Sequence, residues 1–154
     1  MPGHDGDVTQ IEQEFAELQF DSFTHEDALN LGLDLAQRAE EAEWPMATSV
    51  YFGDQNVFRY GCVGSSAMND DFMRRKMNTV LKYKEPSFLV GQRFAEVGKN
   101  FYEETGLPED EYVCFGGGYP IMVNGEIVGL AFTSGAPHEE DHKIIVEALR
   151  AFKG

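Results

Sequence analysis

Apolar residues recur every three or four positions in five stretches of the chain, and this spacing predicts five helices. The stretches cover residues 8–18, 24–43, 70–84, 87–100 and 138–153. Each helix would bury one apolar face against the rest of the fold. In the third stretch we expect this face to consist of Met73, Met77, Val80 and Leu81. In the last stretch we expect it to consist of Ile144, Ile145, Ala148, Leu149 and Phe152.

Several residues at the ends of these stretches are typical of helix boundaries. Thr24, Asn69 and Ser87 stand where the second, third and fourth stretches begin, and short polar side chains there cap free backbone N–H groups. Pro45 and Pro86 follow the second and third stretches, and proline does not continue a helix. We therefore expect these helices to begin at the three caps and to end before the prolines.

Shorter apolar runs between turn residues predict five strands. They cover residues 46–52, 56–60, 112–115, 119–123 and 126–134. Asn124-Gly125 joins the last two runs, and such a pair is a strong hairpin signal because both residues accept a positive φ. A second turn, residues 53–55, joins the first two runs. The sheet is therefore expected to be mainly antiparallel with helices packed on it, in a single α+β or three-layer domain over residues 8–154. Residues 1–7 show no periodicity, and we expect a disordered tail there.

The composition narrows the classes of function. The 154 residues include 27 acidic and 12 basic ones, which gives a net charge of −15. A surface with this much negative charge repels phosphate groups and anionic lipids. We therefore expect the protein to bind neither nucleic acid nor a membrane. Residues 1–7 lack the basic and apolar regions of a secretory signal. Cys62 and Cys114 fit no paired motif and are expected to be reduced thiols, which indicates a cytoplasmic protein.

The basic residues are concentrated in the middle of the chain. Residues 1–44 contain twelve acidic residues and one basic residue, whereas residues 45–104 contain eight of the twelve basic residues. Arg74, Arg75 and Lys76 are consecutive. One interpretation is that these bases pair with acidic helices, within one subunit or between subunits. The other is a local anion site that receives the carboxylates or phosphates of a small ligand.

The first turn of the last predicted helix matches the H-E-x-x-H pattern of zinc peptidases. His138 and His142 stand four residues apart, with Glu139 after the first. Pro137 places the pattern at the start of the helix, and twelve residues after His142 leave no room for a further ligand helix. We therefore expect no metal, and we interpret these residues as solvated residues of a helix N-terminus. Contact of one histidine with a metal or with haem iron stays open as an alternative.

In two segments that contain glycine, the backbone could contact a ligand. Gly116 and Gly117 precede a predicted strand, where glycine allows close approach or simply makes a sharp loop. Ser134 and Gly135 precede the last helix, whose first N–H groups could bind an anion. Neither segment has the spacing of a nucleotide-binding loop or of a hydrolase nucleophile. Small-ligand binding and a purely structural loop remain the two interpretations.

The chain resembles a known superfamily over residues 11–152. The segment GGGYPIMVNGEIVGLAFTSGAPHEEDHKIIVEALRAF is similar to the C-terminal half of the haem-degrading-domain proteins, the HbpS-like and GlcG-like proteins. The residues that carry the resemblance are Gly116-Gly117, Pro120-Ile121, Asn124-Gly125, Val128-Gly129, Ser134-Gly135 and Asp141. The segments LQFDSFTHEDALNLGLDLAQRAEE and RRKMNTVLKY resemble an uncharacterised bacterial and fungal branch of that superfamily.

The resemblance implies a profilin-like or roadblock-like fold with a five-stranded antiparallel sheet, in the order 2-1-5-4-3, flanked by helices. It also implies a homo-oligomer, and the family name implies haem binding or degradation. Two hypotheses follow: a binder of haem or another anionic tetrapyrrole, and a non-catalytic oligomeric scaffold or adaptor; whether the protein is an enzyme stays open. The candidate ligand-binding residues are Arg74, Arg75, Lys76, Gly116, Gly117, Ser134, Gly135, His138, Asp141 and His142.

Overall fold

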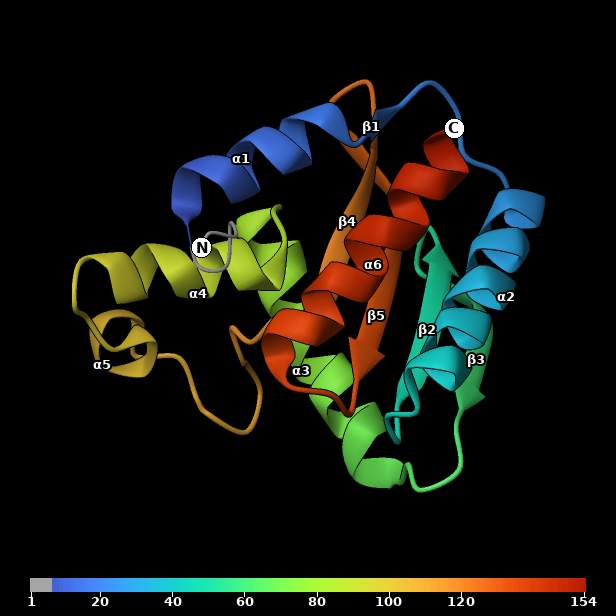
Figure 1. The fold of residues 1–154 in the computed structure, drawn as a ribbon. Helices are drawn as coiled ribbons and strands as arrows, with labels where there is room; N and C mark the ends of the chain where they lie inside the picture. The colour runs from blue at the N-terminus through green and yellow to red at the C-terminus, as the bar shows by residue number, and fades with distance from the viewer. Residues whose placement is uncertain (1–6) are drawn as a thin grey trace.

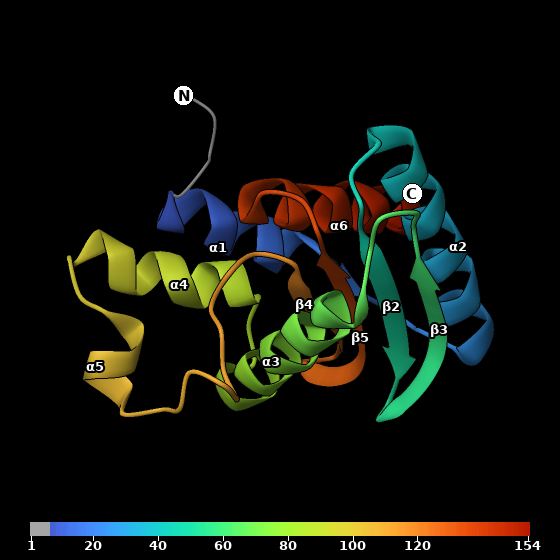
Figure 2. The ribbon, with the colours of Figure 1, turned by 90° about the horizontal axis from the view of Figure 1, so that it is seen from below.

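The computed structural model describes residues 7–154, and within them six helices and five strands follow one another along the chain. In order they are α1 (Val8–Glu17), β1 (Gln19–Phe20), α2 (His25–Ala42), β2 (Ala47–Phe52), β3 (Gln55–Gly61), α3 (Ala67–Tyr83), α4 (Ser87–Glu96), α5 (Phe101–Thr105), β4 (Gly118–Val123), β5 (Glu126–Ser134) and α6 (His138–Lys153). They form three layers: α1, α2 and α6 lie on one face of the sheet, and α3 lies on the other (Figures 1 and 2).

The sheet confirms the predicted α+β class. Its strands lie in the order β3-β2-β5-β4-β1, and the two hairpins and the β2–β5 pair are antiparallel. The four long strands therefore have the neighbours that the order 2-1-5-4-3 gives them. The fifth strand, at the edge beside β4, is the two-residue β1, which runs parallel to β4.

Residues 112–115 do not form the strand that their apolar character predicts. Side chains of the neighbouring helices donate to their backbone carbonyls, so these groups need no strand partner. The hydrogen bonds run from Tyr102 to Tyr112 O at 2.7 Å, from Thr79 to Val113 O at 2.8 Å and from Ser87 to Phe115 O at 2.6 Å. The segment is thereby fixed over α3 and α4 as an irregular strap.

Two helix starts show capping boxes. Thr24 caps α2 as predicted, with Asp27 returning a hydrogen bond to the Thr24 backbone N–H. In α3 the cap is Ser66, and Asn69 is its partner three residues later, so the helix begins earlier than predicted. The prediction placed the cap at Asn69 because both residues are good caps and the apolar pattern starts only at Met73.

The predicted helix over residues 87–100 ends earlier than expected, and a short helix that was not predicted follows it. The first, α4, ends at Glu96, Gly98 has a φ of 71°, and Asn100 caps α5. Ser87 does not cap α4, because it is the first residue of that helix and its hydroxyl faces the strap and β4 instead. Pro86 occupies the cap position, with no side-chain hydrogen bond.

Most of the residues on the predicted apolar faces of α3 and α6 are buried. In α6 the buried residues include Ile144, Ile145, Ala148 and Leu149, all packed in the main core between α2, α6 and the sheet. In α3 the expected Leu81 is exposed, whereas Lys76 is buried. Met73, Lys76 and Val80 share the helix face that points at the sheet, because they are three and four residues apart.

The predicted tail falls mostly outside the described residues, since residues 1–6 are not described. Asp7 belongs to the fold, because its carboxylate accepts hydrogen bonds from the first N–H groups of α1. Among residues 7–154, no helix is both long enough and apolar enough to cross a membrane.

Candidate functional site

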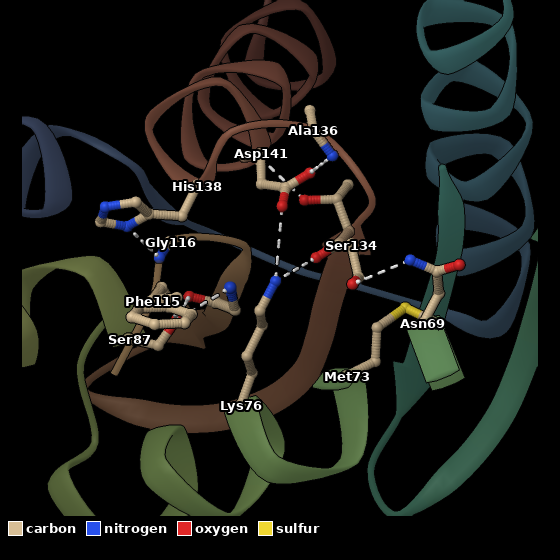
Figure 3. Close-up of polar contacts among 12 residues, drawn as sticks. Asn69, Met73, Lys76, Ser87, Phe115, Gly116, Ser134, Ala136, His138 and Asp141 are labelled. Carbon is tan, nitrogen blue, oxygen red and sulfur yellow. Dashed lines mark hydrogen bonds and ion pairs between the residues drawn. The ribbon is translucent and has the colours of Figure 1, made fainter. Parts of the chain in front are cut away.

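A pocket of about 450 Å³ opens where the end of β5 meets the first turns of α6 and α3. Its apolar lining comes from Pro45, Met68, Phe72, Phe115 and Ala136. Its polar lining comes from Ser66, Asn69, Lys76, Ser134, His138 and Asp141. Figure 3 shows the polar residues converging from α3, β5 and α6 on one region. Elements far apart in sequence thus build one concave surface with apolar walls and a polar base.

Lys76 is the buried cation of this pocket. It rises from α3 and is 2% exposed, and its Nζ donates to Thr133 O at 2.7 Å (Figure 3). Asp141 Oδ2 lies 3.5 Å from the same nitrogen, which is an ion-pair distance but a long one. Burial lowers the pKa of Lys76, and the nearby Asp141 carboxylate opposes this effect.

Asp141 is the matching buried anion. It stands in the first turn of α6 and accepts a hydrogen bond from the Ala136 backbone N–H at 3.3 Å. Burial raises the pKa of this carboxyl to about 6, although Lys76 and the backbone N–H groups of Ala136 and Gly135 act in the opposite direction. The pocket therefore contains an acid that titrates close to neutral pH.

His138 has a defined tautomer. The backbone N–H of Gly116 donates to His138 Nδ1 at 3.1 Å, so this nitrogen accepts and the proton of the neutral ring is on Nε2. Burial lowers the pKa of His138, which keeps the ring neutral. Its Nε2–H, 3.4 Å from Glu139 Oε2, is a hydrogen-bond donor at the start of α6.

The base of the pocket is rich in donors. Ser134 Oγ accepts from Asn69 Nδ2 at 3.3 Å, which leaves the hydroxyl hydrogen of Ser134 free to rotate toward a ligand. Pro137 occupies the cap position of α6 without a side-chain cap, and the N–H groups of Glu140 and Asp141 donate to Pro137 O. The Ser134 hydroxyl and Lys76 favour an acceptor or an anion as the bound group.

Glycine allows the close packing around these residues. A Cβ at Gly117, where φ is 118°, would lie 2.7 Å from Lys76 Nζ and would clash with Thr133 O. A Cβ at Gly116 would clash with His138 O. The glycine run therefore brings the strap against β5 and α6 and leaves room for the buried lysine.

This geometry can be set beside known proteins. A model of the family described as haem degrading protein HbpS-like matches residues 23–150. The chain belongs to the HbpS-like haem-degrading protein family. Its curated relatives are UPF0303 proteins: one from Streptomyces coelicolor is 38% identical over 148 residues, which cover 96% of this chain and 94% of the relative. Another, from Psychromonas ingrahamii, is 33% identical and covers 87% of this chain and 85% of the relative.

Solved structures have the same fold as this chain. The crystal structure of the Ybr137w protein has a TM-score of 0.85 and 27% identity, and the match covers 95% of this chain and 87% of that one. A complex of PduOC with haem has a TM-score of 0.70 and 20% identity, over 84% of this chain and 94% of that one. The predicted superfamily and fold are thus confirmed for this HbpS-like chain.

The structure brings together half of the residues that the sequence nominated. Five of them line the pocket: Lys76, Ser134, Gly135, His138 and Asp141. Gly116 and Gly117 do not line the pocket, but they lie against two residues that do, His138 and Lys76. Asp141 and His142 are buried, so the interpretation of the α6 N-terminus as solvated is wrong for these two residues.

Arg74, Arg75 and His142 lie outside the pocket. Arg74 pairs with Asp71 and Glu111 and donates to Asp110 O, while Arg75 donates to Glu109 O, so both arginines hold residues 109–111, which precede the strap. His142 Nε2 lies 3.0 Å from Glu14 Oε1, on the α1 side of α6. The two histidines of the H-E-x-x-H pattern therefore contact different partners.

Sequence reasoning missed the other lining residues, and four of these contribute large parts of the walls and of the base: Met68, Asn69, Phe72 and Phe115. Asn69 was interpreted only as a helix cap, and its second role depends on Ser134, which is 65 residues away. Phe72 and Phe115 stack with ring centroids 6.5 Å apart, a contact between α3 and the strap that no spacing rule indicates. The position of Phe115 directly before the glycine run was the one available signal.

Proposed function

We propose that this HbpS-like protein binds a small anionic ligand in the pocket, with haem or another anionic tetrapyrrole as the leading candidate. The observation that carries the proposal is the buried ammonium of Lys76 at the base of a pocket of about 450 Å³. Buried charges are paired, and a pocket with apolar walls and a few converging polar groups is the usual form of a small-molecule site. The family description and the haem complex of PduOC support a tetrapyrrole within that class.

The walls suit a flat, largely apolar ligand. Phe72 and Phe115 stack on one another, and Met68 and Phe115 are exposed at the rim. Exposed apolar side chains around a pocket with a polar base are typical of sites for amphipathic ligands. The ring of such a ligand would contact these walls, and its acid group would face Lys76.

The residues present fit the carboxylates of a haem but not its iron. A histidine that binds iron needs a free imidazole lone pair, yet His138 accepts from Gly116 N–H at Nδ1 and carries its proton on Nε2. His142 is buried against Glu14 on the other side of α6. The remaining soft donor of the lining is the thioether of Met68, at the exposed rim. We therefore propose attachment through carboxylates and ring contacts, and we assign no iron chemistry to the site.

The experiment compares haemin with metal-free protoporphyrin IX, which carries the same carboxylates. We expect both to bind with similar affinity, measured by fluorescence quenching and by the Soret band. Lys76→Met should weaken both about tenfold, the effect of losing one charge-assisted hydrogen bond. Lys143→Met, on the exposed face of α6, is the matched control and should change neither affinity.

Two outcomes would contradict the proposal. Tight binding of haemin alone, with a Soret shift that is lost in His138→Ala, would show that iron and not the carboxylates directs binding. Absence of binding by both compounds to the folded wild-type protein would remove tetrapyrroles as ligands. In that case the second candidate, an oligomeric scaffold, gains support from the exposed Leu29 and Leu33 on the outer face of α2.

A further inference from the structure

The base of the pocket contains one cation with two buried acceptors. Lys76 Nζ carries three N–H groups, and within residues 7–154 the structure gives it Thr133 O at 2.7 Å and Asp141 Oδ2 at 3.5 Å. The carbonyl contact is short, and the carboxylate contact is long. Thr133 O therefore fixes the lysine in place, while Asp141 neutralises it without binding it tightly.

The same carboxylate is anchored independently of the lysine. Asp141 Oδ1 accepts from Ala136 N–H, and the Asp141 backbone carbonyl accepts from Thr133 Oγ1 at 2.8 Å. Loss of the contact with Lys76 would therefore leave Asp141 in position. Since both residues line the pocket, a ligand that enters it meets both groups.

We propose that the ligand binds through a carboxylate that replaces Asp141 as the partner of Lys76, and that Asp141 takes up one proton from solvent in this exchange. The inference rests on the proposed function, to which it adds the ligand's head group and a coupling to pH. Two carboxylates beside one ammonium leave one negative charge unpaired in a buried site, and protonation of Asp141 removes it. The protonated acid can then donate to the ligand carboxylate.

The surroundings of Asp141 place this proton on Asp141 itself. Among the described residues, Lys76 from α3 is the charged group that acts on Asp141, and His138, Glu139 and Glu140 share the first turn of α6 with it. From β5 and its turn it meets neutral groups, the Thr133 hydroxyl and the backbone N–H groups of Ala136 and Gly135. His138 is kept neutral by burial and by the Gly116 N–H, so it does not take up the proton.

The sign of the pH dependence follows from these charges. Without ligand, burial places the pKa of Asp141 at about 6. A ligand carboxylate beside it raises that pKa further, because like charges disfavour ionisation. Binding therefore takes up a proton above pH 6, and the affinity rises as the pH falls from 8 to 6. Below both pKa values Asp141 is protonated with and without ligand, and this contribution levels off.

The test uses protoporphyrin IX and its dimethyl ester, which has the same ring but no carboxylate. For the wild-type protein we expect the free acid to bind about tenfold more tightly at pH 6 than at pH 8, and the ester to bind weakly at both. Asp141→Asn carries no proton to exchange, so it should bind the free acid equally at both pH values. Calorimetry of the wild-type protein at pH 7.5, in two buffers of different ionisation enthalpy, should show uptake of a proton without recourse to a variant.

The failures can be told apart. Tighter binding of the acid than of the ester at both pH values, with no pH dependence and no proton uptake, would overturn this inference and leave carboxylate-directed tetrapyrrole binding standing. An unchanged pH dependence in a folded Asp141→Asn protein would assign the proton to another group and would also overturn it. Absence of binding by either compound would overturn the proposed function, and this inference with it.

Discussion

At the scale of single residues, a buried pair joins the first helix to the last. Glu14 of α1 is 4% exposed, and its carboxylate lies 3.0 Å from His142 Nε2 and 3.5 Å from Arg150 of α6. The ring of His142 also packs against Phe88, with centroids 4.7 Å apart. Removing one partner of a buried pair leaves the other without compensation, which costs far more than losing an exposed pair.

We expect Glu14→Ala to lower the free energy of unfolding by about 3 kcal/mol, because His142 would keep its burial and lose its acceptor. Glu12→Ala is the matched control on the same helix: Glu12 pairs with Arg93 at the surface, and the loss should be below about 1 kcal/mol. Urea unfolding followed by circular dichroism measures both. Equal effects of the two substitutions would show that the Glu14 pair does not stabilise the docking of α1.

The chemistry of single residues also explains which residues of the site could be predicted from the sequence. Lys76 and Asp141 were nominated, by a run of bases and by resemblance, but their pairing across 65 positions of sequence is a tertiary fact. Arg74 and Arg75 belong to the same run, yet the helix turns them to residues 109–110, which precede the strap, and turns Lys76 to the sheet. A run of charges in sequence cannot show this, because consecutive residues of a helix point in different directions.

At the scale of elements, long periodic segments were predictable and short ones were not. The hairpin at Asn124-Gly125 and the α6 stripe follow from local rules and are confirmed. The two-residue strand β1 has no periodicity to detect, and it forms because β4 offers it an edge. Residues 112–115 have the composition of a strand, but their carbonyl groups bind helix side chains instead.

The α6 stripe gives a prediction at this scale. Ile145 is 1% exposed in the main core, so Ile145→Asp would bury a charge and remove apolar contacts. We expect a loss of about 3–5 kcal/mol in the free energy of unfolding, seen as a lower thermal midpoint. Glu147→Asp, at an exposed position two residues later, should change the midpoint little. A midpoint unchanged by Ile145→Asp would mean that α6 does not pack on the sheet through this face.

At the scale of the whole molecule, several bases of the middle segment form ion pairs within the chain. Arg93 pairs with Glu12 of the acidic N-terminal third and with Glu85, and Arg74 pairs with Glu111. These contacts favour the interpretation in which the middle bases pair inside one subunit. The net charge of −15 is then left for any assembly to overcome, and contacts between subunits must be mainly apolar.

The homo-oligomer therefore stays a prediction, with its interface now expected on apolar residues. Leu29 and Leu33 lie one turn apart on α2, 43% and 53% exposed, and two such neighbours form a stripe that a second copy could cover. Light scattering should give a multiple of 17.3 kDa for the wild-type protein, and replacing both leucines by serine should reduce it. Val97→Ser, which removes an even more exposed apolar residue after α4, is the control and should leave the mass unchanged. A higher salt concentration screens the repulsion between like-charged subunits and should stabilise the assembly, whereas an interface held by ion pairs would dissociate. A mass of one chain at every protein and salt concentration would contradict the prediction.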